Sequence, residues 1–217
     1  PNGQYDFDNF DTVDHKLLGE HLSQLLQGKE VEVPEYNFTT GMREWNHKKL
    51  RIKDRHVLII EGIHALNPEM TSAVDDSRIF RVYVSALTSL NLDENNNIST
   101  SDNRLLRRMV RDNRVRGVDP ESTIMRWPSV RRGEVRNIFP FQENADVIFN
   151  SALIFELPML KYYAEPLLRR IAPNSPAYPE AARMLRFLSY IPALSPSEIA
   201  TIPPTSIMRE FIGGQTL

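Results

Sequence analysis

Arginine dominates the stretch between residues 104 and 116, and its spacing suggests a phosphate site. Five arginines recur at helical intervals opposite an apolar stripe formed by Leu105, Leu106, Met109 and Val110. Like charges on one helix face repel each other unless an anion or acidic side chains balance them. Guanidinium groups bind phosphate oxygens in a bidentate geometry. The arginines are Arg104, Arg107, Arg108, Arg111 and Arg114, with Arg116 just beyond them.

These arginines also have a simpler interpretation, a solvated helix face whose ion pairs involve Asp112 and nearby acids. Taken alone, the segment favours that interpretation, because charged helix faces are common at protein surfaces. A second basic cluster follows, and the combination favours a phosphate site. Its members are Arg126, Arg131, Arg132 and Arg136.

Glu61 is the acidic residue best placed to act beside a phosphate. It directly follows the apolar run Val57–Ile60, which is typical of a parallel strand buried on both faces. Ligands of open α/β sheets bind at the carboxyl ends of the strands. A carboxylate there can hold Mg²⁺, usually through water. Its position alone equally allows a residue that caps a helix.

The sequence lacks the loop that usually grips the phosphates in such sites. That loop is written Gly-x-x-x-x-Gly-Lys-Ser/Thr, and no glycine here is followed by Lys-Ser or Lys-Thr. The sequence also begins at Pro1. We expect the loop to lie upstream in a longer chain, or this chain to be unable to perform the chemistry by itself.

Strand-like and helix-like segments alternate along the sequence, which predicts an α/β fold with a parallel sheet. A core is expected over residues 1–170 and a helical extension, packed on that core, over residues 171–217. A loop is expected over residues 36–41. Strands are expected over residues 30–33, 57–60, 79–85 and 145–150. Helices are expected over residues 11–27, capped by Asp11 and ended by Gly28, 102–116, capped by Asp102, 179–190 and 206–211.

Composition limits the classes of function. The 217 residues carry a net charge of -2, so the chain has no overall basic field for nucleic acid or anionic lipid. It has no cysteine, which excludes disulfides and thiolate metal ligands and is compatible with a reducing compartment. No apolar run reaches the roughly 18 residues of a membrane span. The five histidines show no metal-binding spacing.

Several segments together resemble one family, the uridine kinase and phosphoribulokinase family of P-loop kinases. The similarity runs from about Tyr5 to Leu217 and is greatest to the uridine kinase-like domain of longer bacterial proteins. It implies a P-loop kinase fold, with a parallel sheet, helices on both faces and an arginine-rich lid, but without the N-terminal P-loop strand. The matching segments are Tyr5–Asp8, Val33–Phe38, Ile59–Ile63, Arg104–Asp112 and Arg209–Gly214.

The resemblance also implies roles for individual residues. Glu61 would be the acid at the end of the Walker B strand, near Mg²⁺. Arg108 would contact the sugar and phosphate side of the acceptor. Arg111 and Arg116 would bind the phosphates of ATP and stabilise the transferring group. The acceptor itself would lie against Phe7, Asp8, Tyr36 and Phe38.

Three departures from the pyrimidine kinases alter the expected acceptor. Gly41 stands where those enzymes have a histidine, and Arg126 stands where they have a glutamine that binds the base. Val118 replaces an arginine of the lid. Because the base-binding set is largely lost and a cation is gained, we expect an anionic acceptor, such as a phosphorylated sugar or nucleotide, in place of uridine.

The expected function is therefore transfer of a phosphoryl group from ATP to a hydroxyl of a small acceptor, in the cytoplasm and away from membranes. The alternative is a non-catalytic module that binds nucleotide or RNA through the basic face of residues 104–136. We expect nucleotide and small-molecule partners, not nucleic acid. In the fold that the resemblance implies, the P-loop strand is central to the sheet. A free chain without it should therefore pair with a copy of itself or be unstable.

Overall fold

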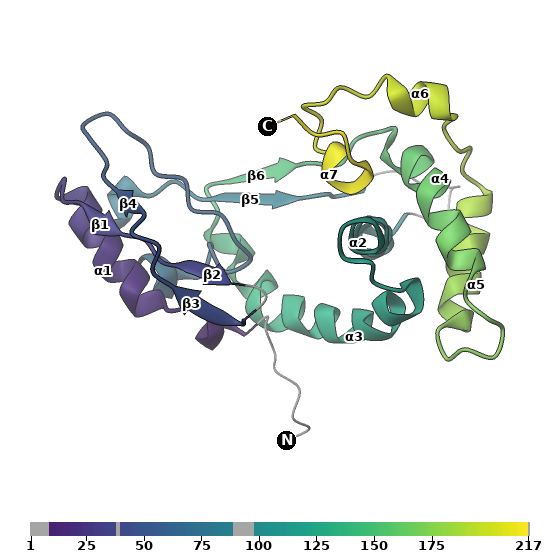
Figure 1. Ribbon diagram of the computed structural model, residues 1–217, viewed down its shortest axis with the longest axis horizontal. Coiled ribbons are helices and arrows are strands. Elements are labelled where there is room, and N and C mark those ends of the chain that lie inside the picture. Colours follow the sequence, from purple (N-terminus) through teal and green to yellow (C-terminus); the bar gives the residue numbers. More distant parts are fainter. Residues whose placement is uncertain (1–8, 38–39, 89–97, 217) are drawn as a thin grey trace. The chain divides into compact units, whose positions relative to one another are not determined.

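The computed structural model describes residues 9–37, 40–88 and 98–216, which fall into two compact units (Figure 1). The first unit comprises Pro1–Tyr83 and Gly133–Val147, and the second comprises Val84–Arg132 and Ile148–Leu217. The expected division into a core, residues 1–170, and an extension, residues 171–217, concerns a different boundary and stays a prediction.

In the first unit, helix α1 (His15–Leu26) follows the short 3-10 turn η1 (Phe10–Thr12). The expected helix is confirmed, but its cap is Asp14, whose side chain accepts a hydrogen bond from the Leu17 amide at 3.0 Å. Asp11 lies instead within η1. The buried face of α1 packs on the 3-10 turn η2 (Pro68–Thr71), which contributes the buried Met70.

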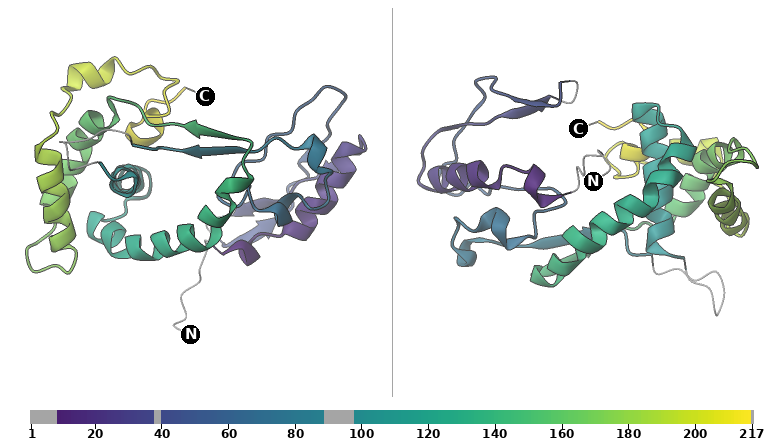
Figure 2. Two further views of the ribbon diagram at one scale, coloured as in Figure 1. Left: turned by 180° about the vertical axis from the view of Figure 1, so that it is seen from behind. Right: turned by 90° about the horizontal axis from the view of Figure 1, so that it is seen from below.

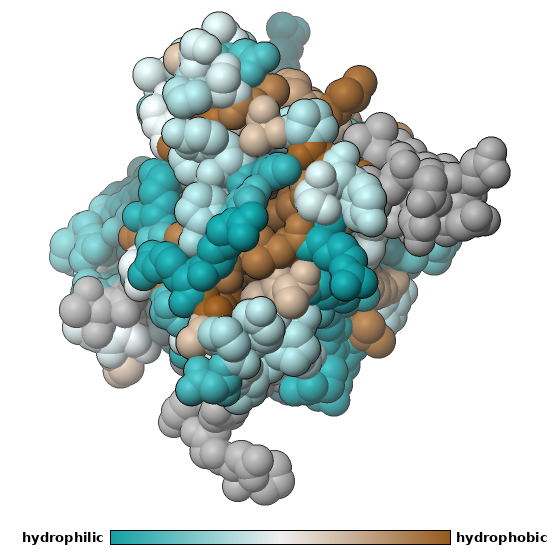
Figure 3. Space-filling view, turned by 90° about the vertical axis from the view of Figure 1, so that its right-hand side faces the viewer, coloured by the Kyte–Doolittle hydropathy of each residue, from teal (hydrophilic) through white to brown (hydrophobic). Residues whose placement is uncertain are grey.

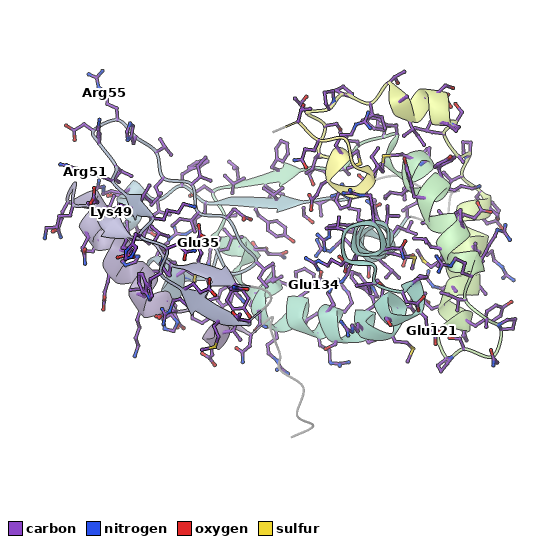
Figure 4. All side chains as sticks on the ribbon, viewed as in Figure 1. Glu35, Lys49, Arg51, Arg55, Glu121 and Glu134 are labelled. Atoms are coloured by element: carbon purple, nitrogen blue, oxygen red, sulfur yellow. The ribbon has the colours of Figure 1, made fainter. Side chains whose placement is uncertain are left out.

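Two antiparallel strand pairs follow α1 in the first unit. Strand β1 (Val31–Glu32) pairs with β4 (Lys49–Leu50), and β2 (Glu35–Asn37) pairs with β3 (Met42–Glu44). In Figure 4, Glu35 lies on β2 and Lys49 on β4. The loop expected over residues 36–41 is thus wrong at Tyr36 and Asn37, which belong to a hairpin strand.

The strand expected over residues 57–60 is absent from the structure, so this prediction was wrong. Val57 is 86% exposed and Ile59 is 84% exposed. A strand buried on both faces needs hydrogen-bonded neighbours at its sides and cover above and below. The sequence has the pattern of such a strand, but within the part of the chain that the structure describes this segment pairs with no strand, and only Leu58 and Ile60 are partly covered.

Strands β5 (Val82–Ser85) and β6 (Val147–Asn150) form a parallel pair (Figure 1). The carbonyl of Arg81 accepts from the Asp146 amide, and the carbonyl of Ser85 accepts from the Ser151 amide, each at 2.9 Å. Both strands were expected, although β5 begins three residues later than residue 79. Helices between two parallel strands are typical of an α/β fold. The 3-10 turns η3 (Asp76–Arg78) and η4 (Phe139–Asn144) precede these strands.

The second unit is built mainly from helices. Helix α3 continues past residue 132 into the first unit, and β5 and β6 also extend across the boundary. Figure 2 shows α4 and α5 side by side, in agreement with their contacts. The helices are α2 (Thr100–Arg116), α3 (Pro120–Asn137), α4 (Glu156–Arg169), α5 (Tyr178–Ser189), α6 (Pro196–Ala200) and α7 (Arg209–Ile212).

One apolar core holds these helices together. The predicted stripe of α2 lies within it, and Leu105, Leu106 and Met109 are fully buried. Helix α2 packs on both α4 and α7. Burial of one Leu or Met side chain contributes roughly 1.5–3 kcal/mol, so this stripe is enough to fix α2 on the core. Residues from the C-terminal helices complete the core: Met159, Leu160, Met184, Leu188, Met208 and Phe211.

Figure 3 faces the α5 side of the second unit and shows apolar surface between hydrophilic side chains. Among the residues that the structure describes, no helix is long and apolar enough to cross a membrane.

Candidate functional site

The arginines lie on α2, and capping residues fix where this helix begins and ends. Ser99 caps the helix by accepting from the Ser101 amide at 3.2 Å, so the expected cap at Asp102 was wrong. Asp102 instead binds Arg183 of α5, with oxygen–nitrogen distances of 2.6 and 2.9 Å. Two hydrogen bonds, the stronger influence from Glu180 and the weaker from Asp102, raise the pKa of Arg183 above its usual range.

Gly117 ends α2 in a left-handed conformation with φ of 63°. Its amide donates to the Asn113 carbonyl at 3.2 Å, and the Val118 amide donates to the Asp112 carbonyl at 3.1 Å. These bonds satisfy carbonyls that a helix end would otherwise leave unpaired. The helix consequently stays regular up to Arg116.

Replacing Gly117 with alanine should lower the free energy of unfolding by about 1–2 kcal/mol, because a side chain disfavours this left-handed conformation. The matched control is Gly19→Ala in the interior of α1, where the new methyl group would only touch Ala73 at 3.4 Å. That control should stabilise by about 0.5–1 kcal/mol. Urea denaturation of both variants measures the difference, and equal shifts would contradict this account of the helix end.

Asp112 gathers three arginines on the surface of α2. Its side chain is only 6% exposed, and Arg108 Nε lies 3.3 Å from its Oδ2. Arg111 Nε lies 3.2 Å from Oδ1, and Arg116 Nη1 lies 3.4 Å from the same oxygen. We call Arg108, Arg111 and Arg116 around Asp112 the arginine cluster.

The arginine cluster is suited to an anion because its positive charges outnumber its negative one. Three guanidinium groups share one carboxylate. Each guanidinium has five N–H donors, so donors remain for a ligand. Arg111 is 31% exposed and Arg116 is 59% exposed, which leaves them accessible. The excess positive charge and the remaining N–H donors therefore suit the cluster to binding a phosphate group.

Two arginines expected on the anion-binding face have structural contacts instead. Arg107 makes a bidentate ion pair with Glu156, whose side chain is 1% exposed, and Nη2–Oε2 measures 2.6 Å. Asn103 also donates to Glu156, at 2.9 Å. Arg114 donates to the carbonyls of Phe211, at 2.9 Å, and Glu210, at 2.7 Å. These two side chains thus anchor α4 and α7 to α2.

The remaining candidate residues lie elsewhere in the chain. Tyr36 is 52% exposed on β2 of the first unit. Glu61 is exposed in the same unit, directly after residues 57–60, which form no strand. Arg126 is exposed on α3 in the second unit, and none of the contacts that form the arginine cluster involves it. Phe7, Asp8 and Phe38 lie outside the described residues.

Metal binding was expected at Glu61. Within residues 9–37, 40–88 and 98–216, no three acidic or histidine side chains are grouped as metal ligands. The role of Glu61 as a ligand of Mg²⁺ therefore stays a prediction. Glu61 could contribute a single carboxylate to a metal centre.

Asp112 was expected only as an ion-pair partner of the arginines, and Glu156 was not among the expected site residues. A signal for Asp112 exists, because it lies four residues after Arg108 and four before Arg116, which places all three along one ridge of the helix. For Glu156 no local signal exists, since its partner is 49 residues away.

Comparisons with known proteins agree with the kinase motifs. The model of the phosphoribulokinase / uridine kinase family matches residues 1–154. A uridine kinase of Aeromonas hydrophila is 33% identical over 143 residues, which cover 65% of this chain and 58% of the relative. A uridine kinase of Halalkalibacterium halodurans is 32% identical over 146 residues, which cover 67% and 61%.

A uridine kinase of Macrococcus caseolyticus is 33% identical over 144 residues, covering 65% of this chain and 61% of that relative. The chain thus spans about three fifths of the length of these relatives. The family match includes α2 with its arginine cluster and ends before α4 begins at Glu156. On this evidence the chain belongs to the phosphoribulokinase/uridine kinase family.

Proposed function

We propose that this chain is part of an enzyme that transfers a phosphoryl group from ATP to a hydroxyl of a small acceptor. The arginine cluster is the observation that carries the proposal. It concentrates excess positive charge on an accessible helix surface, within the segment that the family model matches. The named relatives are uridine kinases, which supports a phosphotransferase.

In this mechanism Arg111 and Arg116 bind the polyphosphate of ATP, and Arg108 binds the phosphate on the acceptor side. Phosphoryl transfer depends mainly on positioning and on electrostatic stabilisation of the three equatorial oxygens. Guanidinium groups that are already held by Asp112 need little reorganisation when negative charge develops. Closing the site to water strengthens these contacts.

Magnesium would neutralise part of the charge on the polyphosphate when it is bound. Glu61 is the residue of this chain proposed to hold it, through water. Because the described residues provide no group of three such ligands, further ligands would come from the phosphates, from water and from other parts of the protein.

The phosphate-binding loop has to come from other residues, because the sequence contains no Gly-x-x-x-x-Gly-Lys-Ser/Thr. We therefore propose that the active enzyme is a longer polypeptide that contains this chain. The proposed boundary between core and extension stays near residue 170.

The acceptor is proposed to be anionic. Gly41 lies in the turn of the β2–β3 hairpin with φ of 69°, and its amide donates to the Asn37 carbonyl at 2.8 Å. Glycine adopts this conformation without strain and offers no side chain that could bind a base. Arg126 is exposed and can pair with a phosphorylated acceptor. Tyr36 remains a candidate to frame the acceptor, together with Phe7, Asp8 and Phe38.

Kinase assays with ATP and Mg²⁺ test this function on two proteins, this 217-residue chain and a longer gene product that includes a P-loop. We expect no turnover by the chain alone and turnover of about 1–100 s⁻¹ by the longer protein. Sugar phosphates should be better acceptors than uridine, and Arg126→Ala should raise KM for them. Efficient uridine phosphorylation that survives Arg126→Ala would contradict the proposed acceptor, and ordinary turnover by the chain alone would contradict the need for a P-loop.

The alternative, a non-catalytic module that binds nucleotide or RNA through residues 104–136, gains no support from the relatives, which are named as kinases.

A further inference from the structure

Helix α7 is fixed against the surface of α2 at the level of the arginine cluster. Arg114 donates to the carbonyls of Glu210 and Phe211. The Arg107 guanidinium lies over the Phe211 ring, 5.1 Å from its centroid, and that ring is only 5% exposed. Figure 1 shows α7 beside α2. The backbone of residue 210 therefore has a defined position beside α2.

The Glu210 side chain extends from this position to the arginine cluster. Its Oε1 lies 3.5 Å from Arg111 Nη1, a long distance for a hydrogen bond. The side chain is 47% exposed. Ion pairs of this kind contribute little to stability, because water solvates both partners well. The Glu210 carboxylate thus places a negative charge beside Arg111 without being firmly bound to it.

We propose that Glu210 is an internal competitor for the anion site and that a bound polyphosphate displaces its carboxylate from Arg111. The inference rests on the proposed function, since it concerns the same arginines. A polyphosphate offers several oxygens to several guanidinium groups at once, so it can replace a single weak carboxylate. Glu210 lies beyond residue 154, where the family match ends, so the competitor and the arginine cluster come from different parts of the sequence.

A purely structural role for Glu210 predicts a different result from a competitive one. If Glu210 only helped to hold α7, its removal would loosen α7 and would leave anion binding unchanged or weaker. If it competes, removing its charge must strengthen anion binding while α7 stays in place. The Arg114 contacts make the second outcome testable, because they involve the backbone carbonyls of Glu210 and Phe211 and survive a change of side chain.

The experiment measures binding of inorganic tripolyphosphate to the full chain by titration calorimetry, for the wild type, Glu210→Gln and Glu165→Gln. The control Glu165→Gln removes the same charge from α4, where Glu165 pairs with Arg169 and Lys161 and not with the cluster. We expect Glu210→Gln to lower Kd about two- to fivefold at low salt and the control to leave it unchanged. In about 0.5 M salt the ratio should approach one, because salt screens exposed charges.

The inference would be overturned if Glu210→Gln bound tripolyphosphate as the wild type does or more weakly, or if Glu165→Gln gave the same gain. Equal binding by wild type and Glu210→Gln would leave the proposed function standing. Absence of binding in all three proteins would overturn both the inference and the anion site on which the proposed function depends.

Discussion

Replacing Glu156 with alanine should lower the free energy of unfolding by about 3–5 kcal/mol, the cost of leaving a buried charge without its partner. The pair is buried, with Glu156 1% exposed and Arg107 12% exposed, so Arg107 cannot recover its lost contacts from water. The change would also leave Asn103 Nδ2 and the Leu153 amide without the acceptor they share. Such buried donors are costly when unpaired.

Urea denaturation of Glu156→Ala beside Glu165→Ala measures this effect. The control removes a carboxylate from ion pairs that are more exposed and should cost about 1 kcal/mol or less. In an Arg107→Met background, Glu156→Ala should cost much less, because the uncompensated charge is gone. Equal losses for Glu156→Ala and Glu165→Ala would mean that the buried pair does not anchor α4 to α2.

Helices α1, α2 and α5 were predictable because their apolar residues repeat at helical spacing, whereas α3, α4 and α6 were not predicted. The stripe of Leu105, Leu106 and Met109 defined both the helix and its buried face. The helix expected over residues 179–190 is α5 at Tyr178–Ser189. The caps were less predictable, because several acidic or hydroxyl residues compete at each helix start. Asp102 looked like a cap but is bound to Arg183, a residue 81 positions away.

The segment at residues 57–60 shows the limit of pattern alone. Its apolar run has the composition of a buried strand, but a strand forms only where neighbouring strands supply hydrogen bonds. The parallel pair β5–β6 shows a related feature, since Ile148 is 63% exposed and Phe149 is 58% exposed. The apolar composition of a segment shows that its residues are suited to burial. Whether they are buried depends on the strands and helices that pack around them.

The candidate site was predictable where its contacts are local. Arg108, Asp112 and Arg116 are four residues apart, so the helix alone brings them together. The sorting of the remaining arginines could not be predicted. Arg107 forms an ion pair with Glu156, which is 49 residues away, and Arg111 lies near Glu210, which is 99 residues away. Contacts between residues so far apart leave no signal in a single sequence.

Removing the arginines of the cluster should affect catalysis far more than folding. Arg111→Ala and Arg116→Ala should each lower kcat of the P-loop-containing protein by about a hundredfold, since contacts made mainly in the transition state can contribute about 3 kcal/mol. Their ion pairs are long and partly exposed, so the folding cost should stay near 1 kcal/mol or below. Leu105→Ala should do the reverse and destabilise by about 2–5 kcal/mol, because Leu105 is fully buried.

The most direct test of the proposed kinase function is kcat for phosphoryl transfer from ATP by the longer protein, measured for wild type, Arg116→Ala and Leu105→Ala beside their denaturation midpoints. The account predicts that Arg116→Ala loses about two orders of magnitude in kcat with a nearly unchanged midpoint, while Leu105→Ala mainly lowers the midpoint. Full activity of Arg116→Ala and Arg111→Ala would show that the arginine cluster is a solvated helix face with no part in phosphoryl transfer.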